Sequence, residues 1–301
     1  IQMITVVGLG PGSKEALTIG VLEILKSNKN IYFRTEKHPN VKYLESMGVK
    51  FNTYDNFYEE YDNFDHIYKA IAEDLIKTYQ HEGDLVYAVP GHPLVAEKSV
   101  TILLDLCKEN GIETRLMPSV SFVDAVIESL RLDPIEGIKI IDAFDIREQV
   151  MDKRLGVIIT QVYNKFIASE VKLALCEYYS DDSDIYFVRA AGIQEEESIR
   201  KIKLYDLDRQ EDIDYLTSIY IPKDIEGPKD FQDLINVMST LRSENGCMWD
   251  LEQTHESLKR GLIEECYEVI EAIDEMDDNK LIEELGDVLF QVIFHAQIGR
   301  E

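Results

Sequence analysis

The sequence predicts an α/β protein followed by an all-α segment, and three observations support this. Over residues 1–222, short β-rich apolar runs alternate with segments of helical periodicity. Prolines and glycines then interrupt the pattern at 223–230, as they do in linkers. After that stretch the strand signal disappears, and residues 231–301 read as long amphipathic helices. At 301 residues the chain exceeds a usual single domain, so we expect two domains joined at 223–230.

The strand candidates are runs rich in Val, Ile, Tyr and Phe. They occupy residues 3–10, 30–34, 84–90, 112–118, 138–144, 155–163 and 184–192. Helical segments separate many of them, as at 15–27, 66–80 and 94–110. This alternation predicts mainly parallel strands, with ligands at their carboxyl ends. The runs 198–208 and 216–222 have no long helix between them, so we expect the last part of the sheet to be mixed.

Composition argues against several classes of protein. A net charge of −27 disfavours nucleic-acid partners, because phosphate backbones attract Lys and Arg. We expect no membrane span, since no run of eighteen apolar residues exists, and no signal peptide at the start. The four cysteines are scattered without a C-x-x-C pair, which favours a cytoplasmic protein without a disulfide framework or zinc site.

Acidic residues are dense in the last 74 residues, which carry 18 acidic and 6 basic side chains. On a helix, Glu264, Glu265 and Glu268 are neighbours, and so are Glu284 and Asp287. Each cluster accompanies an apolar stripe of its own helix. Glu265 and Glu268 border their stripe, whereas Glu264 points nearly opposite. The first stripe is Leu262, Cys266, Val269 and Ile273, and the second is Leu285, Val288, Leu289 and Val292.

If "DEMDDN" turns the chain, the two helices run antiparallel with their stripes together. The bordering carboxylates then meet along one seam and repel each other unless a cation lies between them. Carboxylate oxygens suit Mg²⁺ or Mn²⁺. A solvated acidic face is the alternative, because Glu is a good helix former. Spacing alone leaves both interpretations open.

The stretches "GCMWDLEQTHESLKRGLIEECYEVIEAID" and "LIEELGDVLFQVIFHAQIGRE" resemble the MazG family of nucleoside triphosphate pyrophosphohydrolases. The shared signature is E-E-x-x-E, a spacer, then E-x-x-D. The resemblance covers about 231–301 and implies a homodimeric all-α bundle that cleaves a nucleoside triphosphate to the monophosphate and pyrophosphate. The family continues with further helices that carry phosphate-side cations, so we expect this bundle to be incomplete. The implied catalytic residues are Glu264, Glu265, Glu268, Glu284 and Asp287, and all but Glu264 would hold the Mg²⁺ or Mn²⁺.

Three other residues near this signature have alternative interpretations. A lone Trp249 after a loop is more often a packing anchor than a stacking platform for a base. Lys259 and Arg260 either meet phosphates or lie on a solvated helix face, and the second interpretation is favoured.

Three loops follow strands in the first part: "GLGPGS" at 8–13, "VPGHPLVAE" at 89–97 and "MPSVSFVDAV" at 117–126. Glycines there allow tight turns and a close backbone approach to a ligand. The first loop is not the dinucleotide G-x-G-x-x-G pattern, because its third glycine falls one residue early. Together the loops are expected to line one crevice.

The three loops resemble those of the tetrapyrrole (precorrin and uroporphyrinogen) methylases. The resemblance covers about 3–222 and implies two α/β subdomains, 1–117 and 118–222, with S-adenosylmethionine between them and a tetrapyrrole or other small methyl acceptor. The second loop departs from the family's Gly-Asp-Pro, because it reads Gly-His-Pro; His92 there caps or packs, or has a catalytic role. The implied cofactor contacts are Gly8, Gly10, Pro11, Gly91, His92, Val95, Ser119 and Ser121.

The pairing of these two domains also resembles a bacterial protein type that carries both in one chain. The sequence therefore predicts a metal-dependent nucleotide pyrophosphohydrolase fused to an S-adenosylmethionine-binding domain. The alternative is a tetrapyrrole methyltransferase whose helical tail serves dimerisation or regulation.

Overall fold

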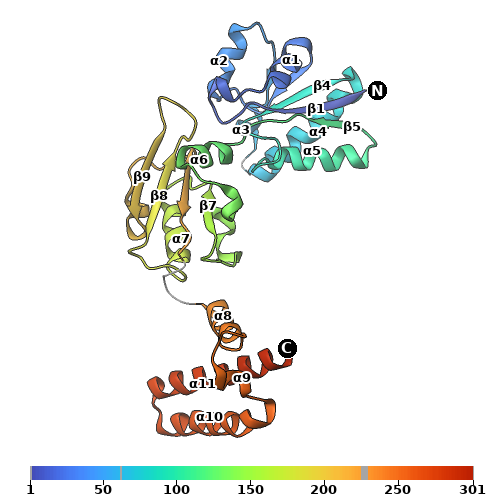
Figure 1. Ribbon diagram of the computed structural model, residues 1–301. Helices are drawn as coiled ribbons and strands as arrows, with labels where there is room; N and C mark the ends of the chain where they lie inside the picture. Colours follow the sequence, from blue (N-terminus) through green and yellow to red (C-terminus); the bar gives the residue numbers. More distant parts are fainter. Residues whose placement is uncertain (1, 62, 225–229, 301) are drawn as a thin grey trace. The chain divides into compact units, whose positions relative to one another are not determined.

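The computed structural model describes residues 2–61, 63–224 and 230–300 (Figure 1). The chain divides into two compact units, Ile1–Ile225 and Glu226–Glu301. The predicted linker, 223–230, lies largely outside the described residues. Each unit is therefore considered by itself.

The first half of unit 1 is a five-stranded parallel sheet in the order β3-β2-β4-β1-β5. On its inner strand β1, Ile4 and Val6 pack with α4 and α5, whereas Val7 faces the layer formed by α1 and α2. This burial on both faces explains the continuous apolar runs. The strands are β1 (Met3–Gly8), β2 (Ile31–Phe33), β3 (Asn52–Thr53), β4 (Leu85–Val89) and β5 (Glu113–Leu116). The helices are α1 (Ile19–Ser27), α2 (Pro39–Ser46), α3 (Phe57–Glu60), α4 (Phe64–Glu82) and α5 (Lys98–Glu109).

The second half of unit 1 is a mixed sheet in the order β6-β7-β10-β8-β9, in which β6 and β7 are parallel and the other pairs antiparallel. The predicted mixed sheet is thus confirmed. Ile158 and Val188 face α6, whereas Val157, Ile159 and Phe187 face α7. The elements are β6 (Ile138–Asp142), β7 (Gly156–Thr160), β8 (Asp184–Arg189), β9 (Ser198–Lys203), β10 (Thr217–Ile221), α6 (Phe122–Leu130) and α7 (Lys165–Leu175). Short 3-10 helices occupy Lys14–Ala16, Pro134–Glu136, Ala143–Glu148 and Leu204–Arg209.

The described residues of unit 2 form four helices joined by short loops. A capping box of Thr254 and Ser257 starts its α10. A small core joins α8, α10 and α11 through Met238, Leu258 and Phe294. The helices are α8 (Phe231–Leu241), α9 (Met248–Glu252), α10 (His255–Glu275) and α11 (Asp278–Arg300).

The predicted order, a two-part α/β region followed by a helical region, is confirmed. Across the described ranges 2–61, 63–224 and 230–300, no helix combines the length and apolarity that a bilayer crossing demands.

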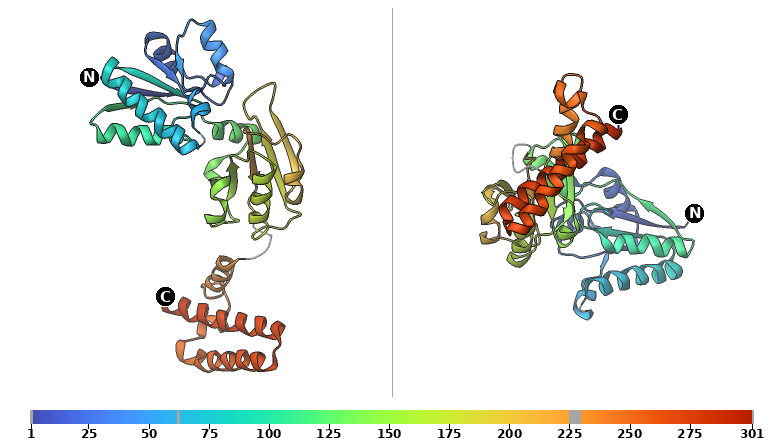
Figure 2. Two further views of the ribbon diagram at one scale, coloured as in Figure 1. Left: turned by 180° about the vertical axis from the view of Figure 1, so that it is seen from behind. Right: turned by 90° about the horizontal axis from the view of Figure 1, so that it is seen from below.

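The pairing of α10 with α11 differs from the prediction. The helices form a hairpin through Met276 and Asp277 and lie side by side (Figure 2). The two apolar stripes do not mate: Ile273 and Val292 are more than half exposed, and Cys266, Leu285 and Leu289 are exposed as well. Small residues face α11 instead, because Ala272 is buried and a Cβ on Gly261 would lie 3.2 Å from Gln291 Nε2. These residues let the backbones approach closely and place the carboxylates in the seam itself.

Side-chain contacts fasten both ends of this hairpin. Beside the turn, Lys280 Nζ lies 3.0 Å from Glu271 Oε2 and 2.9 Å from Glu275 Oε2. At the opposite end, Nδ1 of His255 and Nδ1 of His295 share a hydrogen bond of 2.8 Å with their rings stacked. The carboxylate seam therefore lies between two fixed ends.

Candidate functional site

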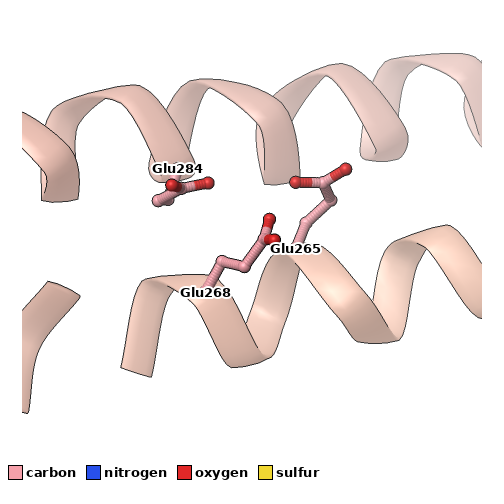
Figure 3. Close-up of side chains that lie close together, drawn as sticks. All are labelled: Glu265, Glu268 and Glu284. Carbon is pink, nitrogen blue, oxygen red and sulfur yellow. The ribbon is translucent and has the colours of Figure 1, made fainter. Parts of the chain in front are cut away.

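Three carboxylates meet between α10 and α11. Glu265 and Glu268 come from successive turns of α10, and Glu284 comes from α11; the three side chains point toward one another (Figure 3). Each offers one oxygen to a group whose members all lie within 4.8 Å of one another. Spacing of i, i+3 on one helix opposite a third acid on the next produces this cluster.

The cluster repels itself electrostatically. Desolvation raises the pKa of Glu265, and the nearby charges of Asp287 and Glu268 raise it further. Desolvation likewise raises the pKa of Glu284, followed by the charges of Glu268 and Asp287. A hard divalent cation would relieve this repulsion and accept these oxygens as ligands. The donor set thus fits Mg²⁺ or Mn²⁺ as the sequence predicts.

The five predicted acidic residues do not all join the cluster. Asp287 is not one of the three that converge within 4.8 Å, yet its charge acts on both Glu265 and Glu284. Glu264 lies on another side of α10, where its Oε1 accepts a hydrogen bond of 2.8 Å from Arg260 Nε. The structure therefore favours Glu265, Glu268, Glu284 and Asp287 as one group and separates Glu264 from it.

Trp249 near the seam differs from the sequence-based expectation, because it is 61% exposed and the packing-anchor interpretation is therefore wrong. Glu271 is exposed and pairs with Lys280. Lys280 went unnoticed in the sequence, although its position one turn before Glu284 was a usable signal.

The glycine loops of the first sheet converge. The Gly8 N–H donates to Ser119 Oγ at 3.0 Å, and Gly10 and Gly91 exchange backbone hydrogen bonds of 3.2 and 2.9 Å. A Cβ on Gly8 would lie only 2.1 Å from the Gly91 carbonyl oxygen and 2.7 Å from Ser119 Cβ. Glycine at position 8 is thus required sterically for the three strand-end loops to meet.

The remaining predicted cofactor residues border the second half of unit 1 or have local roles. Pro11 lies beside Gly192, and Val95 packs with the α6 layer. His92 Nδ1 accepts a hydrogen bond of 3.1 Å from the Leu94 N–H, which agrees with the capping interpretation. The Ser121 hydroxyl takes part in the capping box that starts α6.

Two residues at the start of α2, which the sequence did not single out, form hydrogen bonds with the backbone of the first loop. His38 Nε2 lies 2.9 Å from the Gly10 carbonyl oxygen, and burial lowers the pKa of His38 to about 4. Asn40 Nδ2 donates to the Leu9 carbonyl at 2.8 Å. The signal was the tripeptide His38–Pro39–Asn40 at the start of α2, where the proline occupies the first turn.

A buried ion pair lies between β2 and the second loop. Arg34 Nε lies 3.2 Å from Glu97 Oε2, and Arg34 Nη1 donates to Tyr58 OH at 3.2 Å. The Nε contact is an ion pair without the alignment of a hydrogen bond. Glu97 Oε1 also accepts from the Ser99 hydroxyl at 2.8 Å. Burial raises the pKa of Glu97, while Arg34 opposes that shift.

Converging strand-end loops on a parallel sheet, a second mixed sheet and a carboxylate-lined helical hairpin define a methylase-type α/β protein with an attached hydrolase-type domain. The family model described as Tetrapyrrole (Corrin/Porphyrin) Methylases matches residues 3–208, and the chain belongs to this family. The MazG nucleotide pyrophosphohydrolase domain matches residues 253–301. Both family descriptions name enzymes, and the two resemblances predicted from the sequence are confirmed.

Individual relatives agree with this assignment. Over 99% of its length the chain is 44% identical to the uncharacterized protein YabN of Bacillus subtilis, of which it covers 61%. Over 24% of its length it is 66% identical to the nucleoside triphosphate pyrophosphohydrolase/pyrophosphatase MazG of Thermotoga maritima, of which it covers 28%. The chain thus spans about three fifths of the first relative and just over a quarter of the second.

Solved structures show the fold of unit 1. A uroporphyrin-III-C-methyltransferase from Thermus thermophilus matches with a TM-score of 0.58 and 18% identity, over 77% of this chain and 99% of that one. The methyltransferase CobJ matches with a TM-score of 0.57 and 17% identity, over 74% of this chain and 95% of that one. At these identities the likeness concerns the fold alone.

Proposed function

We propose that the helical unit hydrolyses nucleoside triphosphates to the monophosphate and pyrophosphate in the presence of Mg²⁺ or Mn²⁺. We assign this activity to residues 231–301 and a separate cofactor-binding role to 1–222. The observation that carries the proposal is the convergence of Glu265, Glu268 and Glu284 within 4.8 Å. Four carboxylates in one seam, including Asp287, repel each other without a cation.

The residues divide the work of this reaction. Glu265, Glu268, Glu284 and Asp287 would hold the metal, which supplies charge neutralisation at the phosphates and orients the attacking water. Water adds at phosphorus, and the bond between the α-phosphate and the leaving pyrophosphate breaks. A carboxylate of this group would accept the proton that the attacking water loses. Glu264, which accepts a hydrogen bond from Arg260, would act outside the group of metal ligands.

Pyrophosphate release tests this proposal. The chain is incubated with Mg²⁺ and each nucleoside triphosphate in turn, alongside Glu268→Gln and Asp287→Asn. We expect both substitutions to abolish release, whereas Asp274→Asn, an exposed acid on the same helix, leaves it unchanged. No release by the unaltered chain, or equal release by all three variants, contradicts the proposal.

We further propose that unit 1 binds S-adenosylmethionine through Gly8, Gly10, Pro11, Gly91, His92, Val95, Ser119 and Ser121. Convergence of the glycine loops supports this. A fold neighbour, the uroporphyrin-III C-methyl transferase from Thermus thermophilus with a TM-score of 0.55, is complexed with S-adenyl homocysteine. The methyl acceptor would be a tetrapyrrole or another small molecule. Calorimetric titration with S-adenosylmethionine tests this proposal, and the absence of any heat of binding would contradict it.

The exposed apolar face of the hairpin favours assembly into a homodimer. Ile263, Tyr267 and Ile270 on α10 and Ile282 and Leu285 on α11 are each about half exposed or more. Contiguous apolar surface of this kind marks interaction sites. A second copy of the chain would cover this surface. Dimerisation would also be the function of the helical tail if unit 1 were the sole catalyst. Sedimentation of Ile270→Asp should then show a smaller species than the unaltered chain.

Charge and cysteine usage fit a cytoplasmic enzyme that acts on small molecules. The net charge of −27 makes nucleic acid a poor partner. Cys107, Cys176, Cys247 and Cys266 are all free thiols, as reducing compartments favour.

A further inference from the structure

We propose that the methyl acceptor of unit 1 is an uncharged planar molecule with a carbonyl oxygen, and that Glu97 sets this specificity by neutralising Arg34. This inference rests on the proposed S-adenosylmethionine-binding function of unit 1. It disfavours polycarboxylates such as uroporphyrin III as acceptors. Glu97 acts through Arg34 and is a specificity-determining residue rather than a catalytic one.

The Arg34–Glu97 pair lies at the carboxyl end of the first sheet. Arg34 follows β2 directly, and its backbone N–H donates to the Ala88 carbonyl oxygen of β4 at 2.9 Å. Glu97 is the last residue of the second glycine loop, which contains three of the proposed cofactor contacts. Parallel α/β sheets bind ligands at this end. The pair therefore borders the proposed cofactor site.

Residues of the second half of unit 1 meet the pair at the same place. Tyr163 follows β7, and the Phe144 ring lies edge-on to it with a centroid distance of 5.8 Å. Burial raises the pKa of Tyr163 to about 12, and Tyr68 and Glu97 of the first half raise it further. Both halves of unit 1 therefore contribute side chains to the surroundings of the pair.

Phenol hydroxyls around Arg34 supply hydrogen-bond donors. Arg34 Nη1 donates to Tyr58 OH at 3.2 Å. A phenol that accepts from a guanidinium keeps its own proton free for a further acceptor. Burial raises the pKa of Tyr58 to about 12 and also raises the pKa of Tyr68, so both hydroxyls stay protonated at neutral pH. Such donors suit a ligand atom with a lone pair, such as a carbonyl oxygen.

Exposed aromatic rings flank these hydroxyls. Phe64 is 61% exposed, and its ring neighbours those of Tyr58 and Tyr68 at centroid distances of 6.5 and 6.1 Å. Phe144 beside Tyr163 is 62% exposed. Aromatic side chains bury a large apolar area when a flat ring stacks on them. These rings therefore favour a planar ligand.

The charge balance of the pair disfavours an anionic ligand. Arg34 Nε lies 3.2 Å from Glu97 Oε2, and the Arg34 side chain is 20% exposed whereas that of Glu97 is 4% exposed. The guanidinium is thus the more accessible partner, but the pair as a whole carries no net charge. Lys98 is likewise paired, with Asp65 at 2.6 Å. Because neither cation is uncompensated, an entering carboxylate would lose its hydration without adequate replacement.

Calorimetric titration with saturating S-adenosylhomocysteine present tests the inference. The probes are 2-quinolone, quinoline-2-carboxylate, which has the same fused rings but carries a negative charge, and uroporphyrin III. The unaltered chain should bind 2-quinolone with an affinity about ten-fold or more above that for either carboxylate probe, the usual effect of one uncompensated charge. Equal or tighter binding of a carboxylate probe, or binding of no probe, overturns the inference.

Glu97→Gln distinguishes a specificity role from a purely structural ion pair. It leaves Arg34 uncompensated, so the affinity for quinoline-2-carboxylate should rise about ten-fold or more. Glu170→Gln, which releases Arg147 from an exposed pair at 3.0 Å, is the matched control and should change neither affinity. A structural pair predicts a lower melting temperature for Glu97→Gln without any gain in carboxylate binding.

Tyr58→Phe with Tyr68→Phe keeps the inference testable if Glu97→Gln fails to fold. Loss of both hydroxyls should weaken 2-quinolone binding about ten-fold or more. Tyr205→Phe, at an exposed tyrosine of the second half, is the control and should bind as the unaltered chain does. Unchanged binding of 2-quinolone by the double variant contradicts the assignment of these phenols.

Binding of S-adenosylhomocysteine separates this inference from the function on which it rests. If the unaltered chain binds S-adenosylhomocysteine but prefers the carboxylate probes, only the acceptor class and the role of Glu97 are overturned. If the unaltered chain binds no S-adenosylhomocysteine, the proposed cofactor binding fails, and the inference fails with it.

Discussion

Two individual carboxylates in the α10–α11 seam, those of Glu265 and Glu284, oppose folding when no cation is bound. Folding raises the pKa of Glu265 and of Glu284, so the folded chain holds these protons more tightly than the unfolded chain does. Their unfavourable contribution to the free energy of folding is therefore absent below the ordinary glutamate pKa. It grows as the pH rises through the raised pKa values of the folded chain. Stability without a cation therefore conflicts with the metal binding proposed for these residues.

We accordingly expect Glu284→Gln to raise the melting temperature of unit 2 at neutral pH without metal. The same variant should lose most of the stabilisation by Mg²⁺ that the unaltered chain shows. Calorimetric melting from pH 4 to 8, with and without Mg²⁺, measures both effects. A lower melting temperature for Glu284→Gln in metal-free buffer at pH 7 would mean that the carboxylates do not repel each other as described.

The Arg34–Glu97 pair is the opposite case, because both charges are buried and compensate each other. Glu97→Gln leaves the guanidinium without its carboxylate and should cost about 3–5 kcal/mol in unfolding free energy of unit 1. Replacing both residues, as in Arg34→Met with Glu97→Gln, should recover most of that loss. Urea denaturation followed through unit 1 gives both values. A cost below about 1 kcal/mol for Glu97→Gln would indicate that water reaches the pair.

At the scale of elements, the contact among the three strand-end loops depends on the absence of a side chain at Gly8. Gly8→Ala would place a methyl 2.1 Å from the Gly91 carbonyl oxygen, so the loops must separate. We expect this variant to lose S-adenosylhomocysteine binding by calorimetry. Gly20→Ala is the control, since its methyl would meet only the flexible Met117 Cε at 3.1 Å. Equal binding by the two variants would argue that the ligand does not use these loops.

Local patterns predicted the elements well but not how two of them pair. The glycine loops marked three strand ends that do converge. The stripe from Leu262 to Ile273 was expected to face α11, yet Gly261 and Ala272 do so. Periodicity reports which residues are apolar and not which side the neighbour occupies. Close backbone approach at small residues decided the pairing here.

At the scale of the whole molecule, the two compact units predict two separable unfolding transitions. S-adenosylhomocysteine should raise only the transition of unit 1, and Mg²⁺ with pyrophosphate only that of unit 2. Saturation to about a hundred times the dissociation constant stabilises a unit by about 2.7 kcal/mol. Differential scanning calorimetry resolves the two shifts. If either ligand moved both transitions, the units would be thermodynamically coupled, as a regulatory tail requires.

The order of the two folds was predictable because each carries a long-range pattern of its own. Strands buried on both faces give continuous apolar runs, and the missing helix between 198–208 and 216–222 indicated a mixed sheet. The contact of Arg34 with Glu97 was not predictable. It joins residues 63 positions apart that only the β2–β4 neighbourhood brings together. The same holds for Lys280, whose partners on α10 depend on the two-residue turn.

The fastening of the hairpin at both ends has a consequence for the seam between them. The Lys280 contacts and the His255–His295 hydrogen bond keep α10 and α11 from splaying, so the repelling acids cannot relax by moving apart. A divalent ion, if the seam binds one as proposed, would find its ligands already close together, so its binding would carry little cost of reorganisation.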